Sequence, residues 1–313
     1  MSIQTFPQTT SPEGLEQVLA LLPPVARPDQ IPSVEDMRAG MDQRSAGFRL
    51  PEDLIESPTT LGGRGALRIE PRAGGAQAQG VVLYLHGGGY VIGSPSSHRG
   101  IGARLVQASG ATVYLLDYRL APEYCAPAAS DDARTAWDAL AELHPGEPLA
   151  IAGDSAGGGL TLVLMQRLAA EGHPVQPSAG AMLSPWLDLD VDGYETSGHP
   201  QGLTQDRTLN LDLLGRFGDM YRGDLDARDV QVSPLYGPLK GLAPMLIQVG
   251  DDEVLYRDSL LLIDQLKAAS VENWSCEVWQ GMIHVWQRFW PLLEEADSAM
   301  LNLGEFLREH LTQ

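Results

Sequence analysis

The sequence predicts an α/β fold, in which a mostly parallel β-sheet is covered by helices on both faces. Short apolar runs rich in β-branched residues alternate with longer segments of helical periodicity, a pattern typical of parallel strands joined by crossover helices. Most of the apolar runs are continuous, as expected for strands buried on both faces. The chain has 313 residues, of which 43% are hydrophobic, so it is long enough to bury one large core.

The expected elements follow one another along a single α/β domain. Seven strands are expected, at Ala66 to Glu70, Val81 to Leu85, Thr112 to Leu116, Leu149 to Ala152, Ala179 to Leu183, Met245 to Val249 and Cys276 to Trp279. Helices are expected at Asp131 to Leu143, Ala156 to Glu171, Ser259 to Ala269 and about Pro291 to Leu311. This core comprises residues 46–185 and 233–313.

Two segments interrupt the alternation of strands and helices. Residues 1–45 precede any expected strand and contain helical patterns at Leu15 to Leu22 and Ser33 to Met41. Residues 186–232 are polar and glycine-rich, with an amphipathic piece near Leu209 to Tyr221. We expect both segments to form a helical cap over the carboxyl edge of the sheet.

Charge and cysteine content exclude several classes of partner. The sequence has 21 Lys and Arg against 41 Asp and Glu, a net charge of −20, which repels nucleic acids and anionic membranes. Cys125 and Cys276 cannot build a disulfide framework or a metal site, and we expect both to be small buried side chains. No signal peptide and no run of 18 apolar residues is present, so we expect a cytoplasmic protein without a membrane partner.

The motif Gly153-Asp154-Ser155-Ala156-Gly157 lies between an expected strand and an expected helix. A nucleophilic serine needs a strained strand-to-helix turn, and flanking glycines remove side chains that would clash there. The turn also puts the serine at a helix N-terminus, which favours developing negative charge. Ser155 is therefore the predicted nucleophile.

The run His86-Gly87-Gly88-Gly89-Tyr90 directly follows the expected strand Val81 to Leu85. Acyl transfer passes through a tetrahedral oxyanion, and glycines let backbone N–H groups approach it. We expect the N–H groups of Gly88, Gly89 and Ala156 to be the donors. The run lacks the register of a dinucleotide-binding loop, and no phosphate-binding G-K-[ST] sequence occurs. His86, which ends the strand, is expected to anchor the loop.

His284 follows the last expected strand, which is where the general base is expected in the chain order nucleophile, acid, histidine. We expect the other histidines outside the glycine motif to be solvated surface residues. They are His98, His144, His173, His199 and His310.

Three carboxylates, Asp251, Asp252 and Glu253, follow the expected strand that ends at Val249. Composition does not choose among them. Glu253 directly precedes an apolar pair and a helix start, so it is best placed to be held firmly, and Asp251 is the second candidate for the acid that orients His284.

Together these motifs resemble those of the bacterial hormone-sensitive-lipase-like esterases, a branch of the α/β-hydrolases. The resemblance covers residues 60–313. It rests on the D-Y-R-L-A-P-E run Asp117 to Glu123, the G-D-S-A-G-G run Gly153 to Gly158, the segment Leu183 to Trp186, the acid loop Gly250 to Leu255 and the histidine loop Gly281 to His284.

The resemblance implies that Ser155 is the nucleophile and that His284 is first the general base and then the general acid. It implies that Gly88, Gly89 and Ala156 form the oxyanion hole. Many members of the family have Asp as the acid in a D-P-L pattern, whereas the equivalent position here is Glu253, as in a subgroup that reads G-x-D-E-V-L. By analogy with the family, a homodimer formed through an edge strand is also plausible.

The predicted activity is hydrolysis of short- to medium-chain esters through an acyl-enzyme, without metal or cofactor. The alternatives are a lactonase, amidase or long-chain lipase with the same machinery, or a non-catalytic receptor like the plant gibberellin receptors, which lack the catalytic histidine. Side chains that could line the substrate pocket are equally explained by core packing. They are Tyr90, Trp186, Leu187, Leu209, Leu213 and Val285.

Overall fold

The computed structural model describes residues 1–23, 31–72, 80–194 and 206–312, and in this part of the chain nine strands form one sheet. The strands are β1 (Ser2–Phe6), β2 (Leu54–Leu61), β3 (Arg64–Pro71), β4 (Val81–Leu85), β5 (Thr112–Leu116), β6 (Leu149–Asp154), β7 (Ala179–Leu183), β8 (Met245–Gly250) and β9 (Trp274–Trp279). Their order is β1-β9-β8-β7-β6-β4-β5-β3-β2, and only the pairs β2–β3 and β3–β5 are antiparallel. The predicted mostly parallel sheet is confirmed.

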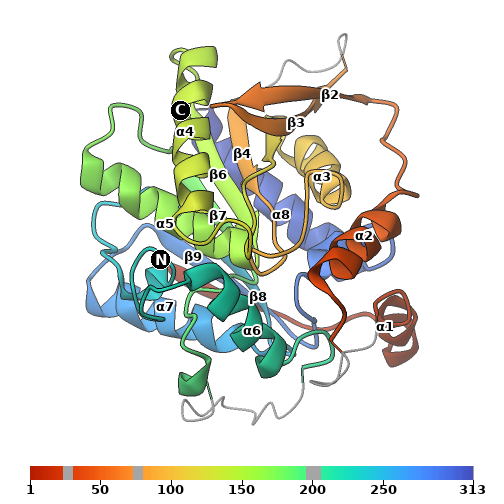
Figure 1. The fold of residues 1–313 in the computed structure, drawn as a ribbon. Coiled ribbons are helices and arrows are strands. Elements are labelled where there is room, and N and C mark those ends of the chain that lie inside the picture. Colours follow the sequence, from red (N-terminus) through yellow and green to blue (C-terminus); the bar gives the residue numbers. More distant parts are fainter. Residues whose placement is uncertain (24–30, 73–79, 195–205, 313) are drawn as a thin grey trace.

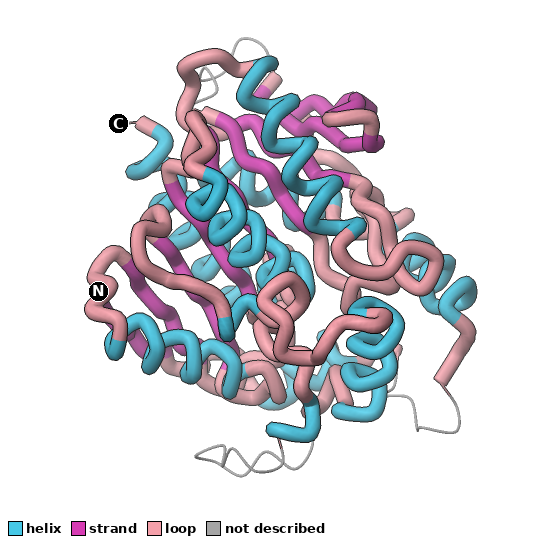
Figure 2. The backbone as a smooth tube through the Cα atoms, turned by 60° about the vertical axis from the view of Figure 1, so that its left-hand side comes forward, coloured by secondary structure: helices cyan, strands magenta, loops and turns pink. Residues whose placement is uncertain are grey.

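Helices cover both faces of this sheet (Figure 1; Figure 2). They are α1 (Pro12–Leu19), α2 (Val34–Ser45), α3 (Arg99–Ser109), α4 (Ala128–Leu143), α5 (Ala156–Glu171), α6 (Leu211–Arg222), α7 (Tyr256–Ala268) and α8 (Glu294–Leu311). Within β4, Leu83 and Leu85 pack in the cluster formed with α4, α5 and α7, while Val82 and Tyr84 pack in the cluster formed with α3 and α8. Successive strand residues point to opposite faces, so a continuous apolar run is what a doubly covered strand requires.

Strand β1 was not predicted, and the expectation that residues 1–45 hold only helices before any strand is wrong for Ser2–Phe6. These five residues are mostly exposed and pair in parallel with β9 at the edge of the sheet. Phe6 stacks on Trp279 with ring centroids 4.2 Å apart. An exposed edge strand needs no apolar run, because its backbone hydrogen bonds and one aromatic contact stabilise it.

Strand β2 and helix α3 were also not predicted, each because its local signal is weak. In β2 only the terminal residues Leu54 and Leu61 are buried. In α3, two glycines lower the helix propensity. One of them, Gly102, packs so closely on the sheet that an added Cβ would lie 2.8 Å from Leu115 Cδ1. Tertiary packing therefore outweighs propensity at this helix.

The two cysteines differ in environment. Cys276 in β9 is buried, as predicted, whereas Cys125 is exposed, so that prediction is wrong. Cys125 lies in the loop before α4, and its Sγ is 3.4 Å from the carbonyl oxygen of Met220.

In the described part of the chain, no helix is long and apolar enough to cross a membrane. No cluster of three or more His, Cys, Asp or Glu side chains suited to a metal ion occurs among these residues either.

Candidate active site

Ser155 lies in the sharp turn between β6 and α5, with backbone angles of φ 54° and ψ −121°. This region is unfavourable for a residue with a side chain, so the surrounding contacts must hold the turn. The Ser155 N–H donates to the carbonyl of Leu183 at 2.8 Å, and the Ser155 carbonyl accepts from Trp186 at 2.9 Å. Both partners belong to the end of β7 and the residues after it, so the neighbouring strand fixes the turn.

The glycines on either side of Ser155 are required by space. A Cβ at Gly153 would overlap the carbonyl of Gly157, and a Cβ at Gly157 would overlap the carbonyl of Leu85 at the end of β4. The turn is therefore packed backbone to backbone against the next strand, which explains why the motif needs glycine at both positions.

Ser155, His284 and Glu253 form a continuous chain of hydrogen bonds. His284 Nε2 lies 2.9 Å from Ser155 Oγ, and His284 Nδ1 lies 2.6 Å from Glu253 Oε2. The three residues come from separate loops at the carboxyl ends of β6, β8 and β9. The structure thus brings together three side chains that were selected from distant parts of the sequence.

Glu253 is fully buried, and burial raises its pKa, although the adjacent His284 opposes this rise. Its second oxygen, Oε1, accepts a hydrogen bond from the Gly250 N–H at 2.9 Å. Asp251, the other candidate for the acid, instead accepts a hydrogen bond from the Gly281 N–H at 2.6 Å. Asp251 therefore joins the acid loop to the histidine loop, while Glu253 contacts the imidazole.

The candidate oxyanion donors lie beside Ser155. Gly88 and Gly89 have positive φ angles of 118° and 60°, and both line the same cavity as Ser155. A Cβ at Gly89 would overlap the ring of Phe217 in α6. Ala156 is the first residue of α5, where the backbone N–H groups have no acceptor within the helix. The glycine loop and the first residue of α5 therefore stay the candidate source of the oxyanion donors.

Asp154 connects the serine turn to the glycine loop, a role that its position in the motif did not predict. Its Oδ1 accepts hydrogen bonds from Tyr84 Oη at 2.8 Å and from the Gly87 N–H at 3.1 Å, and its Oδ2 lies 3.4 Å from His98 Nε2. Burial alone would raise the pKa of Asp154, but His98 and Tyr84 outweigh it and lower the pKa to about 2. Through these contacts, the buried carboxylate fixes the position of the glycine loop relative to the serine turn.

The expectation that His98 is a solvated surface residue is wrong, because its side chain is 4% exposed and contacts Asp154. Its neighbours in sequence gave no sign of this partner. His144, His173 and His310 are half-buried rather than exposed, and His199 lies outside the described residues. His86 is fully buried and stacks on Tyr118, and burial lowers its pKa to about 3, so the ring is neutral and supports the loop.

A cavity of about 780 Å³ opens above Ser155 and His284. Its apolar walls come from α2, from α6 and the residues before it, and from the histidine loop. These walls include Met37, Met41, Leu209, Leu213, Leu214, Phe217, Val285 and Phe289.

Of the six predicted pocket residues, Leu209, Leu213 and Val285 line this cavity. Tyr90, Trp186 and Leu187 do not line it and are fully buried in the core. Tyr90 stacks on Tyr221 with ring centroids 3.7 Å apart. The sequence places these residues next to the motifs but does not show to which side each ring turns. The helical periodicity of α6 predicts an apolar face, and Phe217 of that face was missed.

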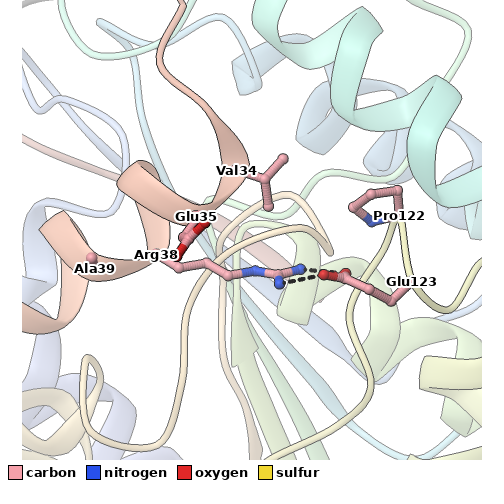
Figure 3. Close-up of a pocket in the computed structure, with 6 residues that line it drawn as sticks. All are labelled: Val34, Glu35, Arg38, Ala39, Pro122 and Glu123. Carbon is pink, nitrogen blue, oxygen red and sulfur yellow. Dashed lines mark hydrogen bonds and ion pairs between the residues drawn. The ribbon is translucent and has the colours of Figure 1, made fainter.

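Polar contacts attach α2, which forms one wall of the cavity, to the rest of the protein (Figure 3). Arg38 makes a bidentate ion pair with Glu123, with both N···O distances 2.8 Å. It also donates to the carbonyls of Val91 at 2.8 Å and Ala121 at 2.9 Å. Mainly through the hydrogen bonds from Arg38, the pKa of Glu123 is lowered to about 2. One guanidinium therefore joins α2 both to the residue Val91 after the glycine loop and to the loop between β5 and α4.

Comparison with known proteins identifies the family of this chain. Residues 82–288 match the model of a family with the α/β-hydrolase fold. The chain belongs to the α/β-hydrolases. The match spans about two thirds of the protein and includes the serine turn, the acid loop and His284.

Curated relatives of this α/β-hydrolase are named as ester or acetyl hydrolases. It is 41% identical to an acetyl-hydrolase of Streptomyces hygroscopicus over 72% of its own length and 75% of that protein. It is 33% identical to an ethyl acetate hydrolase of Pseudomonas putida, covering 77% of this chain and 76% of the relative.

Solved structures similar to this chain are also esterases. An esterase from the bacterial hormone-sensitive lipase family superimposes with a TM-score of 0.86 at 35% identity, covering 97% of this chain and all of the other. The structure of EstE5 soaked with p-nitrophenyl butyrate also has a TM-score of 0.86, at 36% identity with the same coverage. This α/β-hydrolase is accordingly a serine carboxylesterase of the hormone-sensitive lipase family.

Proposed function

We propose that this esterase cleaves short- to medium-chain carboxylic esters with Ser155 as nucleophile, His284 as general base and Glu253 as the orienting acid. The observation that supports this proposal most strongly is the hydrogen-bond chain from Ser155 Oγ through the imidazole to the buried carboxylate. Both ring nitrogens of His284 are engaged, so the tautomer that accepts the serine proton is favoured.

The proposed cycle begins when Ser155 Oγ attacks the ester carbonyl while His284 Nε2 takes the hydroxyl proton. The N–H groups of Gly88, Gly89 and Ala156 stabilise the oxyanion that forms. The imidazolium then protonates the departing alcohol and leaves an acyl-enzyme. In the second half, His284 activates a water molecule that releases the acid.

Glu253 occupies the position that is Asp in many of the hormone-sensitive-lipase-like esterases. Its side chain is longer by one carbon, and its charge stabilises the imidazolium formed during each half-reaction. The Gly250 N–H and burial keep this carboxylate in one orientation. A fixed carboxylate loses little entropy when the transition state forms.

We further propose that the described parts of the two expected cap segments, residues 7–23, 31–45, 186–194 and 206–232, act as a cap that selects the acyl chain, while residues 24–30 and 195–205 of these segments lie outside the described residues. Met41 of α2 and Leu213 of α6 both line the cavity that contains Ser155. A volume of about 780 Å³ with apolar walls suits short and medium acyl chains. One relative acts on ethyl acetate according to its name, which is consistent with a small acyl group.

A rate series tests this function. Purified protein is assayed with 4-nitrophenyl acetate, butyrate, octanoate and palmitate, and with γ- and δ-lactones, beside the Ser155→Ala variant. The proposal expects the highest kcat/KM at butyrate or octanoate, with little turnover of palmitate. Faster hydrolysis of lactones than of any open-chain ester would favour the lactonase alternative. Failure to react with a fluorophosphonate would instead support a non-catalytic receptor.

A further inference from the structure

Two arginines line the cavity that contains Ser155 and His284. Arg44 lies in the last turn of α2, and Arg288 lies in the short helix η4 (Trp286–Phe289), four residues after His284. Among the residues that the structure describes, neither guanidinium forms an ion pair or a hydrogen bond. This contrasts with Arg38, whose guanidinium is fully paired.

In the part of the chain that the structure describes, neither guanidinium is neutralised by a paired carboxylate, although Arg288 Cζ lies 5.7 Å from the centroid of the Phe289 ring. Burial lowers the pKa of Arg44, and burial together with repulsion from Arg44 lowers that of Arg288. The carboxylate that attracts Arg288 is Asp154, which is already bonded to Tyr84 and Gly87 and contacts His98. Arg44 is exposed to solvent and Arg288 is half-buried, so a ligand in the cavity can contact both guanidinium groups without displacing a carboxylate that is already paired with them.

The remaining carboxylate at this cavity does not neutralise the arginines. Asp36 lines the cavity but is exposed at the first turn of α2, where its Oδ2 accepts a hydrogen bond from Ser33 Oγ at 2.7 Å. The protein as a whole carries a net charge of −20. The two arginines in the wall of the cavity that contains Ser155 are therefore opposite in sign to the net charge of the protein.

We propose that the cavity recognises esters that carry a free carboxylate in addition to the scissile bond, and that Arg44 and Arg288 bind this carboxylate. Half-esters of dicarboxylic acids belong to this class. The planar guanidinium fork matches a carboxylate and forms charge-assisted hydrogen bonds with it. The proposal rests on the proposed function, because the same Ser155 performs the hydrolysis.

Matched pairs of substrates test the inference. The first pair is 4-nitrophenyl hydrogen glutarate and the neutral 4-nitrophenyl pentanoate, which have acyl chains of the same length. The second pair is the acetate ester of 4-hydroxybutyrate and neutral butyl acetate. The first pair carries the anion on the acyl side and the second on the alcohol side. For each pair, the ratio of kcat/KM for the anionic ester to that for the neutral ester is measured.

The native protein is expected to favour the anionic ester in at least one pair. In Arg288→Met and Arg44→Met, that ratio should fall by roughly 10- to 100-fold, as expected for the loss of a charge-assisted hydrogen bond. Arg288→Lys, which keeps the charge, should restore part of the preference. Arg216→Met is the matched control, because Arg216 is exposed on α6 and is not part of the cavity wall. The ratio of kcat/KM for the anionic ester to that for the neutral ester should be the same in this variant as in the native protein.

Two results separate this inference from the proposed function. If the native protein hydrolyses the neutral esters but the ratios are the same in the native, Arg44 and Arg288 proteins, the carboxylate site is wrong and the esterase proposal stands. If the native protein hydrolyses no member of either pair, the proposed function itself fails. Fluorophosphonate labelling of each variant shows that the site is folded, and the lysine variant provides a second test if a methionine variant does not fold.

Discussion

His98 Nε2 lies 3.4 Å from Asp154 Oδ2, directly behind the turn that presents Ser155. This buried contact joins the residue before the nucleophile to the N-terminal end of α3, while the other oxygen of Asp154 holds the glycine loop. The candidate oxyanion donors and the serine therefore depend on one carboxylate for their relative position.

Replacing Asp154 by Asn is expected to lower both stability and turnover. Tyr84, Gly87 and His98 each direct a polar group at the Asp154 carboxylate. In the variant at least one of these buried donors has no acceptor, which costs about 1–3 kcal/mol in the free energy of unfolding. Urea unfolding measures this loss. Asp212→Asn, at an exposed position on α6, is the control and should unfold like the native protein.

The same residue gives a pH dependence with a defined sign. The pKa of Asp154 is lowered from 3.8 to about 2 in the folded protein, so its charged form is favoured by folding. Its stabilising contribution is present above about pH 4 and is lost as the pH falls towards 2. The native protein should therefore lose more stability than Asp154→Asn over this interval. Equal losses in the two proteins would contradict the assignment.

Ser155→Ala should reduce kcat/KM for 4-nitrophenyl butyrate by roughly 10³- to 10⁶-fold, as removal of a nucleophile does in other triads. The fold should persist, because the variant loses only one oxygen atom. Circular dichroism checks the fold, and Ser57→Ala on the exposed face of β2 is the control. Ester hydrolysis at the native rate would exclude Ser155 as the nucleophile.

Glu253→Gln tests the acid while keeping the size of the side chain. Loss of the charge beside His284 should lower kcat by roughly 10³- to 10⁴-fold. Asp251→Asn is the matched comparison, since its amide oxygen can still accept the hydrogen bond from Gly281. Its rate should remain within about 10-fold of native. A larger loss in Asp251→Asn than in Glu253→Gln would reverse the assignment.

Arg38→Met should loosen α2, because this change removes the ion pair to Glu123 and the hydrogen bonds to Val91 and Ala121. Since α2 forms a wall of the cavity but holds none of the proposed triad, KM for 4-nitrophenyl butyrate should rise several-fold while kcat changes little. Arg49→Met, at an exposed position outside the cavity wall, is the control. A fall in kcat at constant KM would contradict this role for α2.

Local patterns in the sequence predicted most of the core. The central strands are continuous apolar runs because both of their faces are covered, and α5 begins and ends where its periodicity predicted. Elements with weak local signals were missed: β1 is an exposed edge strand, and α3 contains Gly102, which packs closely on Leu115. For these elements the stabilising partner lies far away in the chain.

In the candidate site, too, some features follow from neighbouring residues and others depend on contacts between distant parts of the chain. Gly153 and Gly157 are needed within one short turn, so consecutive residues were enough to select Ser155 as the candidate nucleophile. Tyr90 is also adjacent to a motif, yet its ring stacks on Tyr221 in the core rather than lining the cavity. Adjacency in sequence fixes the backbone position but not the direction of the side chain.

By itself, the sequence determined the fold class, the serine turn, the glycine loop and a late histidine, because each depends on steric and hydrophobic requirements of neighbouring residues. Tertiary structure alone decided that Glu253 rather than Asp251 contacts His284, and that His98 is buried against Asp154. The reason is that parallel strands bring their carboxyl ends to one edge of the sheet, so distances there depend on how separate loops meet.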